Sequence, residues 1–152
     1  MKQSRGFTLT ELLIVMGIIF ILAFMSYIAS SFYLPKIELS GQTRELVGDL
    51  RYAQQLAVTE QLNYAVCFFP LGGGGYEKKY QVIQHGQCGT SPALVERIFD
   101  NIEIEAVNFS NPEVVFNPYG SVAESGGIVL RNSEGATSTI DVRPSGFVKI
   151  ID

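Results

Sequence analysis

The fold is decided by residues 5–34, which read RGFTLTELLIVMGIIFILAFMSYIASSFYL. Between Phe7 and Pro35, the only ionisable side chain apart from tyrosine is Glu11. The 23 residues from Leu12 to Leu34 would span about 34 Å as a helix. The hydrocarbon core of a bilayer is roughly 30 Å thick. The stretch therefore predicts a helix that crosses a membrane.

Lys2 and Arg5 precede this apolar stretch, and no acidic residue does. Positive charge on the short N-terminal side predicts that this end stays in the cytoplasm and that the rest of the chain lies outside. Two other interpretations stay open on these residues alone. One is a secretory signal peptide with a weak cleavage site near residues 28–31, although the apolar region is long for one. The other is a plain signal anchor.

The run from Arg5 to Val15 closely resembles the class III signal of type IV prepilins. In that family a short basic leader ends in glycine, and a prepilin peptidase cuts it on the cytoplasmic side of the bacterial inner membrane. The resemblance implies cleavage between Gly6 and Phe7, followed by N-methylation of Phe7. Residues 1–6 would then be the leader, and Glu11 would be the fifth residue of the mature chain.

Glu11 has a physical role under this interpretation. A carboxylate in a bilayer is costly, by about 2.5–3.5 kcal/mol at the centre of a helix, and somewhat less near the interface. The resemblance implies that Glu11 pairs with an N-terminal amine, usually that of a neighbouring subunit, and so sets the register of assembly. The alternative is a glutamate that lies at the interface without a partner.

Helical periodicity continues beyond Pro35. We expect one hydrophobic transmembrane or filament-core helix over residues 7–35 and an amphipathic continuation over 36–63. Pro35 and Gly17 are expected points of bending or termination, and Ser40–Gly41 is a possible break. The apolar face of the second half is formed by Leu46, Val47, Leu50, Ala53, Leu56 and Ala57.

From residue 64 the pattern changes to short runs rich in Val, Ile, Phe and Tyr, separated by Gly, Pro, Asn and Ser. The predicted fold class is α+β, with a long N-terminal helix packed on an antiparallel β-rich globular head over residues 64–152. We expect strands near residues 64–69, 80–84, 96–99, 103–109, 114–116, 128–131, 139–142 and 147–150.

Four segments narrow the resemblance to the GspH/FimT group of pilin-like proteins. They are RELVGDLRYAQQLA at 44–57, AVCF at 65–68, VFNPYG at 115–120 and IDVRPSGFV at 140–148. The group implies a minor pilin or pseudopilin. The segment after the final glycine departs from relatives reported to bind DNA, which are basic there, because it carries one lysine and one aspartate.

Charge also argues against a nucleic-acid partner. The formal net charge is −4, and loss of Lys2 and Arg5 with the leader leaves 9 basic and 15 acidic residues, or −6. Binding to phosphate backbones needs clustered Lys and Arg. The candidate nucleic-acid contact is Lys78 with Lys79, which lie between two tyrosines. A solvated hairpin explains the same residues.

Cys67 and Cys88 are the only cysteines. Export to an oxidising exterior favours a disulfide between them, and two separate thiols are the alternative. Metal binding is disfavoured because His85 is the only histidine. The glycines at 72–75 lack the Lys-Ser/Thr of a phosphate-binding loop and predict a flexible hairpin tip. No nucleophile motif is present, so we expect neither a cofactor nor an enzyme.

The sequence therefore predicts a structural subunit of a type IV pilus or a type II secretion pseudopilus, one that helps to initiate or cap the filament. Its expected partners are other pilins or pseudopilins, the prepilin peptidase/methyltransferase and the inner membrane, with the head outside and a possible place in a surface pilus. The alternative is a tip module that binds DNA or a secreted substrate and uses the helix only as an anchor.

Overall fold

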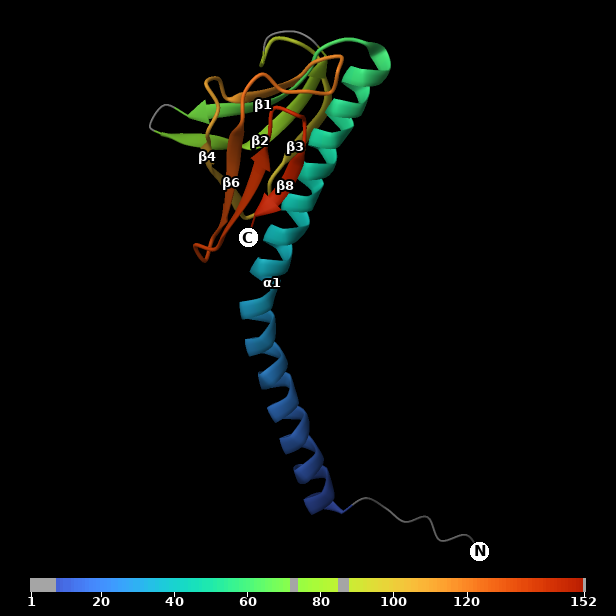
Figure 1. Ribbon diagram of the computed structural model, residues 1–152. Helices are drawn as coiled ribbons and strands as arrows, with labels where there is room; N and C mark the ends of the chain where they lie inside the picture. The colour runs from blue at the N-terminus through green and yellow to red at the C-terminus, as the bar shows by residue number, and fades with distance from the viewer. Residues whose placement is uncertain (1–7, 72–73, 85–87, 152) are drawn as a thin grey trace, which may run out of the picture. The chain divides into compact units, whose positions relative to one another are not determined.

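The computed structural model describes residues 8–71, 74–84 and 88–151, except for the side chains of residues 28–32. The chain divides into two units, Met1–Leu34 and Pro35–Asp152, and each is described here by itself. The described residues form one helix, α1, and eight strands (Figure 1). The first unit contains the apolar part of α1. The second contains the rest of α1 and all of the strands.

Helix α1 runs from Leu9 to Glu60. Thr8 precedes it, and the Oγ1 of Thr8 accepts the backbone N–H of Glu11 at 3.3 Å, as a helix N-cap does. The helix ends before Gln61, because the φ of Gln61 is 58°, a left-handed conformation that cannot continue a right-handed helix. The Nε2 of Gln61 donates to the carbonyl oxygen of Val58 at 2.6 Å.

The possible break at Ser40–Gly41 is wrong, because α1 continues through both residues. Leu39 and Thr43 on either side are buried in the head, and the Oγ1 of Thr43 donates to the carbonyl oxygen of Leu39 at 2.7 Å. Tertiary packing thus outweighs the weak local propensity of Ser and Gly. Pro35 likewise lies inside α1 and does not end it.

The first unit exposes its apolar side chains. Leu9–Tyr27 has a mean hydropathy of 2.4 over 19 residues, and within the described part of the chain it is the one helix segment long and apolar enough to cross a membrane. Its large apolar side chains are at least 45% exposed. Exposure of this kind is costly in water, so this helix requires a bilayer or neighbouring helices around it.

The strands of the second unit form two antiparallel sheets. The first has the order β3-β2-β1-β5 and contains β1 (Tyr64–Leu71), β2 (Gly75–Gln84), β3 (Ala93–Ile98) and β5 (Glu113–Phe116). The second has the order β4-β6-β7-β8 and contains β4 (Ile102–Val107), β6 (Gly126–Asn132), β7 (Thr137–Val142) and β8 (Val148–Ile151). Each predicted strand corresponds to an observed one.

One main core joins α1 to both sheets. The helix contributes Leu46, Leu50, Ala53 and Ala57, all of them fully buried. The sheets contribute aliphatic and aromatic side chains to the same cluster, among them Val66, Phe68, Tyr80, Phe116, Ile128, Leu130 and Ile140. The apolar side chains at helical spacing thus form one face of α1, and the strands pack on this face.

The hairpin interpretation of residues 76–80 is confirmed, because β2 pairs antiparallel with β1, but the strand begins before the predicted residue 80. Strand β2 begins at Gly75 and includes this stretch. Tyr80 is buried and its ring lies 6.3 Å from that of Phe68 and 5.3 Å from that of Phe99. The core therefore requires an extended backbone here. Of the expected glycine tip, Gly72 and Gly73 lie outside the described residues, and Gly75 belongs to the strand.

Candidate functional site

The predicted processing site lies at the N-terminus. Gly6 and Phe7 are outside the described residues. Glu11 stands three residues after the N-cap Thr8, in the first turn of α1. A carboxylate there interacts favourably with the helix dipole. The side chain of Glu11 is exposed, and no cation of the described residues pairs with it. Its carboxylate is therefore accessible to another molecule.

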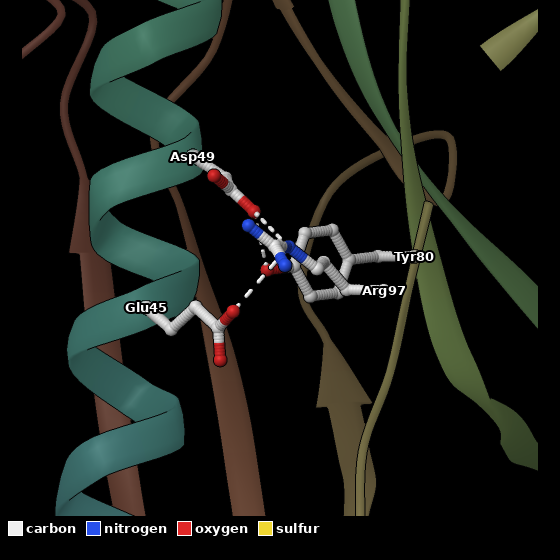
Figure 2. A network of polar contacts seen from close by, with 4 residues as sticks. All are labelled: Glu45, Asp49, Tyr80 and Arg97. Carbon is white, nitrogen blue, oxygen red and sulfur yellow. Dashed lines mark hydrogen bonds and ion pairs between the residues drawn. The ribbon is translucent and has the colours of Figure 1, made fainter. Parts of the chain in front are cut away.

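Four polar residues fix the sheet to the helix. The phenolic hydroxyl of Tyr80 on β2 donates to Oδ2 of Asp49 on α1 at 2.7 Å. The Nε of Arg97 on β3 lies 3.4 Å from the same oxygen and 3.3 Å from Oε1 of Glu45. Figure 2 shows these side chains converging between the helix and the two strands. We call this set of four residues the Asp49 network.

Charge explains the arrangement of the Asp49 network. The pKa of Tyr80 is raised, mainly by burial and secondly by the hydrogen bond to Asp49. Its hydroxyl therefore stays protonated and remains a donor. Asp49 and then Glu45 raise the pKa of Arg97. The Asp49 network was not predicted from the sequence. The sequence did carry one signal of it, since Glu45 and Asp49 are four residues apart and therefore lie on one helix face. Two neighbouring carboxylates favour a basic residue close by.

Two turns that carry the family resemblance meet at Gln54. Its Nε2 donates to the carbonyl oxygen of Gly120 at 2.7 Å. Gly146, with φ +77°, packs so closely that a Cβ at this position would lie 1.9 Å from the same oxygen. The backbone N–H of Val122 donates to the carbonyl oxygen of Pro144 at 3.0 Å. The three separate motifs therefore form one structural site that holds the C-terminal turns against α1.

Cys67 on β1 and Cys88 are joined as a disulfide, with 5.7 Å between their Cα atoms. Oε2 of Glu113 lies 3.1 Å from Sγ of Cys88. The two sulfurs and this carboxylate are close enough together to hold a metal ion. A metal needs cysteine as the thiolate, however, and neither sulfur is a thiolate while the two are bonded to each other. His85 lies outside the described residues.

The two candidate nucleic-acid contacts already have partners. Nζ of Lys78 lies 3.1 Å from Oε1 of Glu103, and Nζ of Lys79 lies 2.8 Å from Oε2 of Glu77. The pKa of Lys79 is raised, first of all by its hydrogen bond to Glu77. Lys79 also lies over the ring of Phe69, 4.9 Å from its centroid. Neighbouring carboxylates thus offset the charge that phosphate binding would use.

Comparison with known families decides between the interpretations of this helix and head. Residues 42–146 match the family described as Type II transport protein GspH. The chain belongs to the GspH family. Residues 1–27 match the prokaryotic N-terminal methylation motif. GspH and its relatives are structural pilins and pseudopilins, so the interpretation as a minor pilin or pseudopilin is confirmed.

Solved structures show the same pilin-like fold. The minor type IV pilin FimU of Pseudomonas aeruginosa superposes with a TM-score of 0.61 at 14% identity, covering 77% of this chain and 90% of FimU. The minor pseudopilin EpsH of the Vibrio cholerae type 2 secretion system gives a TM-score of 0.57 at 6% identity, covering 75% of this chain and 96% of EpsH. A search of curated protein sequences gave no match.

Proposed function

We propose that this GspH-family protein is a minor subunit that enters a pilus or pseudopilus through its N-terminal helix and helps to start or cap the filament. The observation that carries the proposal is the exposed apolar segment Leu9–Tyr27, which lies within the match to the N-terminal methylation motif, residues 1–27. A segment of this kind needs apolar surroundings on every side. A bilayer provides them before assembly, and the helices of other pilins provide them afterwards.

Processing precedes assembly in this proposal. A prepilin peptidase removes residues 1–6, and the new N-terminus at Phe7 is methylated. Glu11 then lies about 6 Å along the helix axis from its own N-terminal amine and pairs with the amine of a neighbouring subunit. Support comes from the exposed carboxylate of Glu11 in the first helical turn. Before assembly, residues 7–35 cross the inner membrane with the N-terminus in the cytoplasm and the head outside.

The head acts as a rigid module without turnover. Residues 36–63 hold the β-rich head, residues 64–152, through the buried helix face, the Asp49 network and the Gln54 contact. Its function in the proposal is to present a surface to other subunits. It uses no cofactor and carries out no reaction. A DNA-binding tip is not favoured, because Lys78 and Lys79 pair with glutamates.

Recovery of the chain in filaments tests the role of Glu11. We expect Glu11→Gln to lower the amount of processed chain in sheared filaments at least about tenfold, because loss of an ion pair in a low-dielectric environment costs more than about 1.4 kcal/mol. Processing itself should continue. Glu134→Gln, an exposed glutamate of the head, is the matched control. Equal recovery of both variants would remove Glu11 from the assembly mechanism.

A further inference from the structure

A groove separates α1 from the last strand of the second sheet. It has a volume of about 410 Å³. Arg44, Val47, Gly48 and Arg51 line it on the helix side. On the other side it is lined by residues 147–150, which include most of β8. Figure 1 shows β8 beside the part of α1 that belongs to the same unit.

Strand β8 presents an edge to this groove. It pairs with β7 and is the last strand in the order of its sheet. In an edge strand, the backbone N–H and C=O groups of alternate residues point away from the sheet and have no partner strand. On this side, among the described residues, the Nη2 of Arg51 donates to the carbonyl oxygen of Val148 at 3.4 Å. The edge can therefore accept one further strand.

The charges of the groove are unbalanced. Arg44, Arg51 and Lys149 are exposed, and none of them has a carboxylate within 4.0 Å in the described part of the chain. Five other basic residues in or next to the strands are ion-paired, namely Lys78, Lys79, Arg97, Arg131 and Arg143. Three unpaired cations thus gather around one strand edge in a protein with a net charge of −4.

Gly48 leaves space on the helix side. Glycine in a helix interior costs about 0.5–1 kcal/mol relative to alanine. A Cβ at position 48 would meet no atom of the described structure within 4 Å, so packing within the chain does not require a glycine here. The missing side chain widens the groove next to β8, where the backbone of an added strand would lie.

We propose that this groove binds an acidic, extended segment of a neighbouring filament subunit, which adds to the edge of β8 as a further strand. Its backbone would pair with β8, and its carboxylates would reach Arg44, Arg51 and Lys149. Its apolar side chains would cover Phe147, which lines the groove and is 52% exposed. The inference rests on the proposed role as a filament subunit. An apolar N-terminal helix fits less well, since the one carried here has Glu11 as its sole acidic residue.

A peptide probe tests the chemistry of the groove on the full chain in lipid nanodiscs. The probe is DNIEIEAVN, the sequence of residues 100–108, which is acidic and alternates as a strand does. We expect it to slow amide exchange in residues 147–151 about tenfold or more. Arg44→Glu and Arg51→Glu should each weaken peptide binding about tenfold. Arg131→Glu, a charge reversal at a residue paired with Glu105, should leave binding unchanged.

Two modified probes separate charge from backbone pairing. A peptide with both glutamates replaced by lysine, and one with N-methyl groups on alternate residues, should each fail to protect residues 147–151. Unchanged exchange with the parent peptide, equal binding of the lysine peptide, or equal binding to the Arg44 and Arg51 variants would overturn the proposal. A single-stranded oligonucleotide that displaced the peptide at lower concentration would assign the groove to nucleic acid instead.

Photo-crosslinking in cells tests the source of the segment. A benzophenone amino acid in place of Lys149 should give an adduct to an acidic extended segment of another filament subunit, mapped by mass spectrometry. Adducts solely to exported proteins or lipids would overturn the proposal. Mass spectrometry of filaments sheared from the same cells shows whether the chain enters filaments. A chain that is present in filaments but gives no subunit adduct would refute the groove while leaving the proposed function intact.

Discussion

The hydroxyl of Tyr80 on β2 donates a 2.7 Å hydrogen bond to the carboxylate of Asp49 on α1. The bond joins a strand in the middle of the first sheet to the helix, and Arg97 reaches the same carboxylate from β3. A buried hydroxyl needs such a partner, because an unsatisfied polar group in a core is costly. The relationship thus stabilises the packing of the head on the helix.

Tyr80→Phe should lower the free energy of unfolding by about 1.5–3 kcal/mol, the range for a hydrogen bond to a charged group. Urea unfolding of the full chain in mild detergent, followed by near-ultraviolet circular dichroism, measures the change. Tyr119→Phe is the matched control, because Tyr119 is 91% exposed. A Tyr80→Phe protein as stable as the control would show that Asp49 does not depend on this hydroxyl.

Gly146→Ala should destabilise the head by about 3 kcal/mol or more, or prevent folding, because strain at a positive φ and a severe clash act together. The new Cβ would lie 1.9 Å from the carbonyl oxygen of Gly120. Gly135→Ala isolates the contribution of φ. Gly135 has φ +84°, but a Cβ there would lie 3.7 Å from Nη2 of Arg131, an ordinary contact distance. Similar losses in both variants would contradict the close contact between the two turns.

The stability of the head should fall at alkaline pH partly through Tyr64. Its hydrogen bond to Glu60 raises the pKa of Tyr64 to about 12, above the usual value near 10. Because the folded state favours the protonated tyrosine, this group contributes its full stabilisation below pH 10. The contribution is lost as the pH rises from 10 through 12. Urea unfolding at a series of pH values should therefore show a steeper alkaline loss for the parent protein than for Tyr64→Phe. Parallel curves would contradict the role of Glu60.

The disulfide should be present in protein exported to an oxidising environment. Unfolding without reductant should leave both cysteines unreactive toward iodoacetamide. Replacement of both by serine should lower the free energy of unfolding by about 3 kcal/mol according to the chain-entropy estimate, given a separation of 21 residues. Cysteines that react before reduction would favour the alternative of two separate thiols.

Periodicity predicted most of the fold. The helical spacing from Leu46 to Ala57 reflects one buried helix face, and runs of β-branched and aromatic residues mark strands wherever turn residues separate them. Local propensity failed at Ser40–Gly41, and it placed the start of β2 at residue 80 instead of Gly75. In both places distant residues determine the conformation. Burial of Leu39 and Thr43 keeps the helix continuous, and burial of Tyr80 keeps the strand extended.

The sites were predicted less completely than the fold. The N-terminal motif is local in sequence and could be read directly. The contact of Gln54 with Gly120, and that of Asp49 with Tyr80, join residues 66 and 31 positions apart, and single-sequence periodicity carries no information on such pairs. The groove beside β8 also depends on which strand forms the edge of the sheet, which only the topology reveals.

The most direct test of filament assembly is mass spectrometry of the N-terminal peptide, in sheared surface fibres and in the inner-membrane fraction of the same cells. We expect a methylated peptide that begins at Phe7. Its presence in the fibres would place the protein in a surface pilus, and its confinement to the membrane would indicate a secretion pseudopilin or an assembly primer. An intact leader, residues 1–6, in both fractions would contradict the account and leave a simple membrane-anchored domain.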